Sequence, residues 1–453
     1  MIDAVHSNFN IQPALFPISL SFILLFLSAF SLPSKSKSAI YFRLILLPFQ
    51  LIIAYDIAIN PTYSLGSAFR NSAFPSLAYF IIYRALDFAL INLWDNQLAF
   101  HWIIPQTSIS NNSNLQSIKW KKAPLPESFS FDRIIWSLDN LFAMRPGTPW
   151  LFPWKLRALD WSKSKLESNH SIFGQPEWPI HWAIPQQILH LLCHLYIRKL
   201  NLNHNQNLFL QPYLTQVSLT FALGGIVAFS NALEEAIIFP ILIKFNILPK
   251  TALISFSNRP ILSTSLSEFW GKRWHQLWRR SFIRIARLVP GSNHPAIHLM
   301  ATFWVSALMH CLLISRLYPT PNPLQNPKSL LPLFYEPGIY FFFLSQGLGI
   351  LIEQACSFLF SKILFHSSKY NQLKAVNHSK NSKNLNHQLQ NPQIILKRLA
   401  KIFNLLWLLV VLIGTGRHVT NTLVLKGLML KVEWDKVSWK TLIKSLFNLP
   451  STF

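Results

Sequence analysis

The chain has 453 residues, of which 51% are hydrophobic and only 13% are charged. Soluble domains carry about 25% charged residues, so this composition argues against a soluble protein and predicts an integral membrane protein. The formal net charge is +24, but the basic residues lie between apolar segments, where membrane lipids with anionic headgroups or a phosphate-bearing substrate account for them. No nucleic-acid-binding motif is present, so we expect no nucleic-acid partner.

Apolar segments long enough for a membrane-spanning helix recur along the chain, since a span needs about 20 mostly apolar residues. The predicted spans are Ala14–Leu32, Ala39–Ile59, Phe74–Leu93, Pro179–Ile197, Tyr213–Phe229, Leu233–Leu248, Pro295–Ser315, Gly338–Phe360 and Ile402–Gly414. The last of these is short, and residues 426–453 add an interfacial segment. We therefore predict an all-α, polytopic membrane protein whose bundle of about eight to ten transmembrane helices encloses a cavity within the membrane.

Polar regions divide the chain into three parts. Residues 1–93 are predicted to form N-terminal transmembrane helices, residues 94–178 a long, basic polar loop, and residues 179–453 the main helical core. Within the core, the segment from about residue 366 to 393 is rich in Asn, Gln, Ser and Lys and has few apolar residues, which predicts disorder.

Basic residues concentrate in residues 94–178, 249–290 and 361–401, and the last region holds eight Lys or Arg residues and no acidic residue. The positive-inside rule predicts that all three regions face the cytosol. A count of the predicted spans places residues 249–290 on the other side of the membrane, so the sequence leaves the topology open.

The stretch RPILSTSLSEFWGKRWHQLWRR, residues 259–280, combines aromatic and basic side chains. Ser265 and Glu268 have the spacing of a capping box, which predicts a helix start. Read as one helix, the stretch has an aromatic face with Trp270, Trp274 and Trp278. A second face holds Lys272, His275 and Arg279. This pattern predicts an amphipathic helix at the membrane interface, with tryptophan rings at headgroup depth. Because an anchor does not account for His275, a role in an active site stays open.

His310 lies in the middle of the apolar run ATFWVSALMHCLLI. An ionisable side chain in a membrane span is costly unless it faces the bundle interior or a cavity. Ser306 lies on the same helical face, and the small side chains of Ser306 and Ala307 leave space beside the imidazole. Two interpretations remain, namely a core histidine held by a carbonyl or hydroxyl group, and a functional residue.

The run FFFLSQGLGILIEQ places Gln346 and Glu353 seven residues apart, on one face of a predicted span. A buried carboxylate requires a partner. The pair predicts either a hydrogen bond between helices or a contribution to a functional site.

Two histidine pairs, His190 with His194 and His294 with His298, have the spacing of metal ligands on a helix. Membrane di-iron enzymes also require clustered histidine boxes, and neither these nor an HExxH motif occurs in the sequence. We therefore predict no metal site. No GxSxG or phosphate-loop motif is present either.

The residue 259–280 stretch, the later FWVSALMH and the still later SQGLGILIE together resemble the wax-synthase-like branch of the membrane-bound O-acyltransferase family. That branch carries an RPxxSxSxxxFWGRRWN/H signature, a histidine in an apolar helix and a QGxxxxxE segment, so the resemblance covers residues 259–353. It implies that His310 is the catalytic histidine and His275 the second polar residue of the site. Ala307 stands where the family usually has glycine.

The resemblance implies transfer of an acyl group from acyl-CoA to the hydroxyl group of a lipophilic alcohol, with no resident cofactor. A neutral imidazole accepts the hydroxyl proton, and a neighbouring donor stabilises the oxyanion. The expected substrate-binding residues are Trp270, Arg273, Trp274, Arg279, Ser306, Gln346 and Glu353. The cations of the 259–280 stretch attract either CoA phosphates or lipid headgroups.

The acceptor remains open between a long-chain alcohol, which gives a wax ester, and a terpenoid or other secondary metabolite that receives an acetyl group. The relatives imply the endoplasmic reticulum membrane as the location. Two other classes are a membrane transporter or lipid-binding protein without enzymatic activity and a di-iron oxidoreductase. The first would require broken helices matched in two halves, and the second a histidine box; neither pattern is found.

Overall fold

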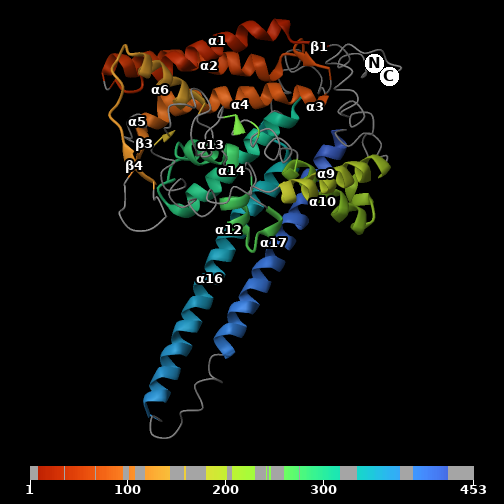
Figure 1. Ribbon diagram of the computed structural model, residues 1–453. Coiled ribbons are helices and arrows are strands. Elements are labelled where there is room, and N and C mark those ends of the chain that lie inside the picture. Colours follow the sequence, from red (N-terminus) through yellow and green to blue (C-terminus); the bar gives the residue numbers. More distant parts are fainter. Residues whose placement is uncertain are drawn as a thin grey trace.

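The structure, a computed structural model, is built mainly of helices (Figure 1). It describes residues 9–34, 36–66, 68–94, 101–107, 118–142, 158–159, 180–200, 207–229, 241, 244–245, 260–274, 276–316, 334–377 and 391–426. Six helices among these residues are long and apolar enough to cross a membrane. The predicted all-α, polytopic membrane architecture is confirmed.

The N-terminal layer consists of three long helices that lie side by side at the top of Figure 1. They are α1 (Gln12–Ser31), α2 (Lys37–Ile59) and α4 (Ala73–Leu86), which continues into the π-helical turn η1 (Asp87–Ile91). Ser36 caps α2 by accepting the backbone N–H of Ala39. Short elements complete the layer: β1 (Phe9–Asn10), β2 (Ser64–Leu65), α3 (Ala68–Asn71) and α5 (Asn92–Trp94).

The described part of residues 94–178, expected as a polar loop, contains regular structure. A three-stranded antiparallel sheet of order β4-β3-β5 is made of β3 (Trp102–Thr107), β4 (Ile118–Lys122) and β5 (Ala158–Leu159). Helix α6 (Phe131–Phe142) follows the hairpin. The indole N–H of Trp102 donates to the buried carboxylate of Asp139 over 2.9 Å, which ties the sheet to α6.

The remaining elements form the core that holds the candidate site. They are α9 (Ile180–Leu200), η3 (Leu208–Leu210), α10 (Tyr213–Phe229), η6 (Pro260–Leu262), α12 (Leu266–Glu268), η7 (Phe269–Arg273), α13 (Gln276–Ala286), α14 (Pro295–Ile314), α16 (Pro337–Asn377) and α17 (Asn391–Leu425). Helix α14 packs against α4, α13 and α16, so it joins the N-terminal layer to the core.

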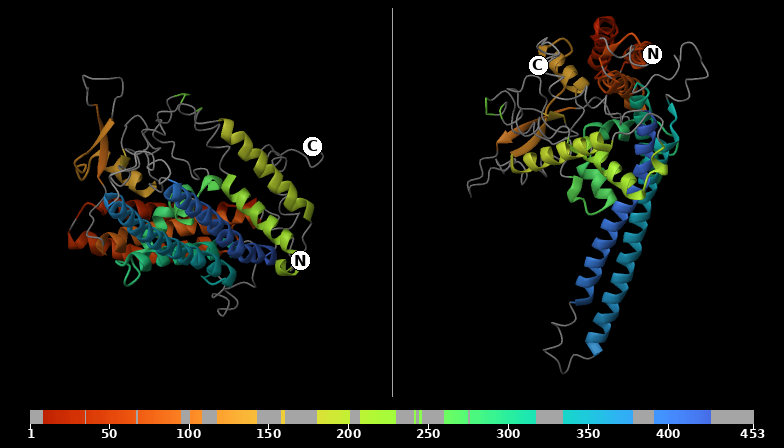
Figure 2. Two further views of the ribbon diagram at one scale, coloured as in Figure 1. Left: turned by 90° about the horizontal axis from the view of Figure 1, so that it is seen from below. Right: turned by 90° about the vertical axis from the view of Figure 1, so that its right-hand side faces the viewer.

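Helices α16 and α17 form a long antiparallel pair whose free end projects from the body of the molecule (Figures 1 and 2). The segment from about residue 366, expected to be disordered on composition, is helical as far as Asn377 and again from Asn391. The predicted span Ile402–Gly414 is part of a longer apolar stretch, Arg398–Leu425.

The other predicted spans compare as follows. Five of them correspond to spanning helices in α1, α2, α4 with η1, α14 and α16. Two correspond to the shorter apolar segments Ile188–Ile197 and Tyr213–Val227. Predicted span Leu233–Leu248 and the interfacial segment after residue 426 lie almost wholly outside the described residues.

Candidate active site

From Ser265 onward the 259–280 stretch folds into two helical pieces, α12 continued by η7 and then α13, instead of one helix. Ser265 accepts the N–H of Glu268 over 3.0 Å, as its N-cap position predicts, and so starts α12. The Glu268 carboxylate accepts the backbone N–H and the hydroxyl of Thr264, each over 2.8 Å. The capping signal is therefore confirmed, although the return bond goes to Thr264 and not to Ser265.

The predicted continuous amphipathic helix is wrong because the chain breaks at Trp274. The N–H of Trp274 donates to the carbonyl of Phe269 over 2.7 Å, which closes the π turn η7, and Trp274 itself is extended with φ −93° and ψ 135°. The three tryptophans consequently share no face. Trp270 and Trp274 pack with Phe269, whereas the ring of Trp278 meets the ring of Tyr79 on α4 at 5.3 Å.

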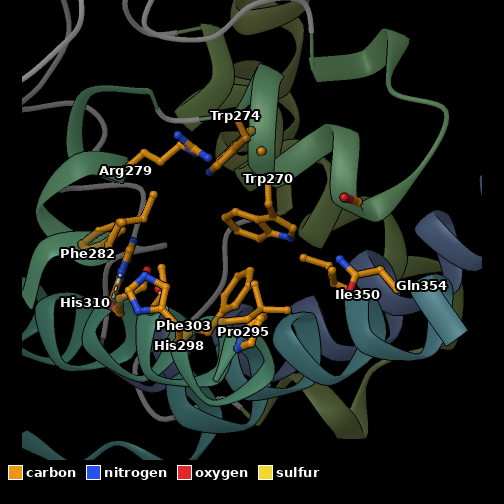
Figure 3. Close-up of a pocket in the computed structure, with 16 residues that line it drawn as sticks. Trp270, Trp274, Arg279, Phe282, Pro295, His298, Phe303, His310, Ile350 and Gln354 are labelled. Atoms are coloured by element: carbon orange, nitrogen blue, oxygen red, sulfur yellow. Dashed lines mark hydrogen bonds between the residues drawn. The ribbon is translucent and has the colours of Figure 1, made fainter. Parts of the chain in front are cut away.

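A cavity of about 430 Å³ lies between η7, α13, α14 and α16 (Figure 3). Figure 3 shows Trp270 and Trp274 on one side of it, His310, His298 and Phe303 on the other, and Ile350 with Gln354 at one end. The lining is mostly apolar and aromatic, with a few polar groups. The polar side chains are Ser267, Arg279, His298, Thr302, Ser306, His310 and Gln354. This combination is typical of a small-molecule site.

His310 projects into this cavity from α14, as its position in the apolar run predicts. Its Nδ1 lies 2.7 Å from the backbone carbonyl of Ser306. Because a carbonyl oxygen only accepts, Nδ1 carries the proton and the neutral ring keeps a lone pair on Nε2. The ring of Phe343 packs on the imidazole with centroids 4.3 Å apart. One nitrogen thus fixes the ring, and the other keeps a lone pair that is able to accept a proton.

The segment that contains this cavity wall also matches a family model. Residues 254–327 match the model of the membrane bound O-acyl transferase family. The match supports membership of this family. It includes Trp270, Arg279 and His310 but ends before α16. Comparisons with curated proteins and with solved structures give no significant match.

The tryptophan wall of this O-acyltransferase-like segment is held from α16. The indole N–H of Trp270 donates to Oε1 of Gln346 over 3.2 Å, and the amide of Gln346 donates to the hydroxyl of Thr415 on α17 over 2.8 Å. Trp270 also packs edge-to-face on Phe303, with centroids 5.4 Å apart. Gln346 is fully buried and does not line the cavity. The structure therefore places Gln346 behind Trp270.

Glu353 holds the first turn of α12. Its carboxylate oxygens accept the backbone N–H groups of Leu266 over 2.7 Å and Ser267 over 3.3 Å. These amides have no partner within the helix, and an anion there is favoured by the helix dipole. Glu353 is buried and lies outside the cavity lining. Glu353 therefore caps the N-terminus of α12 beside the cavity.

Two glycines let α16 approach the site closely. A Cβ added at Gly347 would lie 2.8 Å from the sulfur of Met300 and 3.1 Å from the Phe303 ring on α14, and one at Gly349 would lie 2.7 Å from Leu266. Such distances are shorter than van der Waals contact, so larger residues would separate the helices. The run SQGLGILIE thus combines two close contacts with the bonds of Gln346 and Glu353.

The basic residues of the 259–280 stretch lie in different environments. Arg273 pairs with Glu268 at 2.7 Å and does not line the cavity. Burial alone would raise the pKa of Glu268, but the Thr264 hydrogen bonds and Arg273 outweigh it and lower the pKa. Lys272 is exposed. Arg279 lines the cavity, and burial lowers its pKa, because charge is costly away from water.

The remaining residues that the sequence singled out lie in different places. Ser306 and Trp274, which the sequence analysis expects to bind substrate, line the cavity, while His275 lies outside the described residues. His294 is the exposed N-cap residue of α14, whereas His298 lines the cavity. Within the described residues no group of three or more His, Cys, Asp or Glu side chains lies together to hold a metal.

The sequence interpretation missed two cavity residues that a regular spacing could have indicated. His298, Thr302, Ser306 and His310 follow one another every four residues on α14, and all four line the cavity. A four-residue spacing keeps side chains near one helical face. Extending the pattern backwards from His310 would have found Thr302 and His298.

Proposed function

We propose that the protein is a membrane-bound O-acyltransferase that moves an acyl group from acyl-CoA to a hydroxyl group of a lipophilic acceptor. The observation that carries the proposal is the His310 imidazole, which faces an apolar cavity with Nδ1 bonded to the Ser306 carbonyl and Nε2 left to act as a base. The family match over residues 254–327 supports the same reaction class.

In the proposed reaction, Nε2 of His310 accepts the proton of the acceptor hydroxyl as its oxygen attacks the thioester carbonyl. The new C–O bond forms, and the carbonyl becomes a tetrahedral oxyanion. When this collapses, the C–S bond breaks and the CoA thiolate leaves with the proton from the imidazolium. Cavity donors stabilise the oxyanion; Ser306 lies beside His310, and the resemblance adds His275 as a proposed donor. The apolar walls exclude water that would hydrolyse the thioester.

We propose a long-chain alcohol as the acceptor and the endoplasmic reticulum membrane as the location, both on the resemblance to the wax-synthase-like branch. The test is to incubate microsomes that contain the protein with labelled acyl-CoAs of increasing chain length and a panel of alcohols and terpenoids. Wax ester formation that is lost with His310→Ala supports the proposal. If product forms only from acetyl-CoA and a terpenoid, the acceptor is a terpenoid and not a long-chain alcohol. If no donor and acceptor in the panel give a transfer product, the proposed function is wrong.

Arg279 is the cation of the 259–280 stretch that we assign to the donor, because it lines the cavity while Arg273 is paired with Glu268. We expect Arg279→Ala to raise the KM for acyl-CoA by about 10-fold to 100-fold, since a hydrogen bond to a charged group contributes about 1.5–3 kcal/mol. Arg279→Lys should retain part of the affinity.

The measurement is initial-rate kinetics with acyl-CoA and with the matching acyl-pantetheine, which lacks the nucleotide phosphates. Lys272→Ala, which removes an exposed cation two residues from Trp270, is the control. An unchanged KM for acyl-CoA in Arg279→Ala would leave Arg279 a role at lipid headgroups. An equal rise for both donors would exclude a phosphate contact and place the effect of Arg279 on the acyl-pantetheine part of the donor.

A further inference from the structure

An ionic cluster is buried at the interface between the N-terminal layer and α13. Asp87 is fully buried, and its two carboxylate oxygens face different arginines. Arg284 on α13 donates from Nε to Oδ1 over 2.5 Å, and Arg84 on α4 lies 3.5 Å from Oδ2. Arg284 also donates to the side-chain oxygen of Asn92 over 3.2 Å. Residues almost 200 positions apart are thus joined by one carboxylate.

Asp87 carries a single negative charge but lies near three positively charged arginine side chains. Arg84 and Arg284 contact it directly, and both side chains are almost fully buried. Arg280 lies close enough to interact electrostatically with Asp87 and Arg284; burial lowers its pKa to about 10. Loss of the carboxylate would remove a negative charge that contacts two buried guanidinium groups, and removing one partner of a buried ion pair is strongly destabilising.

Helix α13 carries the cavity wall as well as the ion pair. Arg279, Phe282 and Ile283 line the cavity opposite α14. Ser281 and Arg284 face α4 instead, and the Ser281 hydroxyl bonds to the Tyr79 hydroxyl over 3.0 Å. The helix has only 11 residues and follows directly on the break at Trp274. A shift at Arg284 is therefore transmitted to Phe282 within the same short helix.

The helix that carries His310 is fixed to the same N-terminal layer by apolar packing. Val305, Met309 and Leu312 of α14 belong to the apolar cluster that includes α4 residues. Helix α13 packs on the same cluster through Phe282, and the buried Asp87–Arg284 ion pair adds a directional contact to this packing. Asp87 therefore helps to fix the position of α13, and with it the cavity wall opposite His310.

We infer that Asp87 is a positioning residue for acyl transfer, which acts through Arg284 to hold the Arg279 and Phe282 wall opposite His310. The inference rests on the proposed function for its effect on the reaction. It adds a residue from the N-terminal helices, outside the segment that matches the family model, to the determinants of the site.

The test compares Asp87→Asn, which keeps the shape and removes the charge, with Asp87→Glu, which keeps the charge. Misplacement of a catalytic site by about 1 Å costs on the order of 100-fold in rate. We expect kcat/KM to fall by about that factor in Asp87→Asn and to recover at least partly in Asp87→Glu. Arg284→Gln should resemble Asp87→Asn, and the double variant should be no worse than either single variant, since both act at one contact.

Tyr79→Phe is the matched control, because it removes an uncharged hydrogen bond across the same α4–α13 interface. Melting temperature is measured for every variant. A positioning role predicts that Asp87→Asn loses far more activity than Tyr79→Phe for each degree by which the melting temperature falls. Wild-type kcat/KM in Asp87→Asn, or activity that falls only in proportion to melting temperature in both variants, would overturn the inference.

Backbone hydrogen exchange of α13 gives a second readout that needs no activity. Faster exchange confined to α13 in Asp87→Asn, and absent from Tyr79→Phe, supports the positioning role. Unchanged exchange contradicts it. If the wild type transfers no acyl group in the substrate panel, the proposed function fails, and the exchange result still decides whether Asp87 positions α13.

Discussion

Replacing His310 by alanine is expected to reduce acyl transfer to about 0.01–1% of the wild-type rate, since general acid–base catalysis by a positioned side chain contributes about 10²–10⁴-fold. The substitution removes an imidazole that lines the cavity and whose Nδ1 is bonded within its own helix, which leaves the lone pair on Nε2. The main chain of α14 should keep its position, because its neighbours Met309 and Cys311 are buried in the apolar packing. Loss of rate in kcat, with little change in the KM for the donor, is the result to measure.

His294→Ala provides a matched control for this change. It removes an imidazole from the same helix, but at an exposed N-cap position that makes no side-chain capping bond. We expect the His294 variant to keep most of the wild-type activity and both variants to elute as monodisperse protein in detergent. Full activity in His310→Ala would remove the proposed base, and equal loss in both variants would point to a defect in α14 itself.

The sequence predicted the features that depend on local pattern. The hydrophobic runs were long enough to identify the spanning helices. The cost of a histidine in an apolar run left His310 as either a core histidine or a functional residue, and the structure places it at a cavity with Nδ1 bonded to the Ser306 carbonyl. The cap at Ser265 was predicted from spacing alone. Each of these follows from residues within about one or two helical turns of one another, which is the range that a sequence pattern records.

Features that depend on tertiary contact were not predicted. The π turn before Trp274 interrupts a segment whose spacing suits a continuous helix, and it separates Trp278 from the other two tryptophans. Asp87 was overlooked, although an acidic residue in an apolar span is itself a sign of a buried partner. Its partner Arg284 lies in another helix far along the chain, so no spacing could have indicated the pair.

Glu353 shows how a residue expected to bind substrate is placed beside the site instead. Its carboxylate caps α12, and α12 leads directly into η7 with the cavity residue Trp270. Removal of the side chain in Glu353→Ala leaves two amide groups at the start of α12 without an acceptor. An unsatisfied buried donor costs about 1–3 kcal/mol, so we expect a loss of about 2–4 kcal/mol in the free energy of unfolding.

Glu353→Gln should fall between the alanine variant and the wild type. A glutamine oxygen still accepts one N–H, but the negative charge that favours a helix N-terminus is gone. Because Ser267 and Trp270 follow the cap, we also expect lower activity with a raised KM, in contrast to the kcat effect of His310→Ala. The measurement is thermal unfolding in detergent together with acyl-transfer kinetics.

Glu336→Gln is the matched control on the same chain segment. Glu336 pairs with Lys426 at 2.6 Å just before α16, but both side chains are partly exposed to solvent. Exposed ion pairs contribute about 0–1 kcal/mol, so this variant should melt within a few degrees of the wild type and keep its activity. If Glu353→Ala were as stable as Glu336→Gln, the cap would not hold α12. If it were equally stable and yet had a raised KM, Glu353 would contact the substrate, as the sequence suggested. The two roles of Glu353, as a cap and as a ligand, are thus separated by stability and KM measured on the same pair of variants.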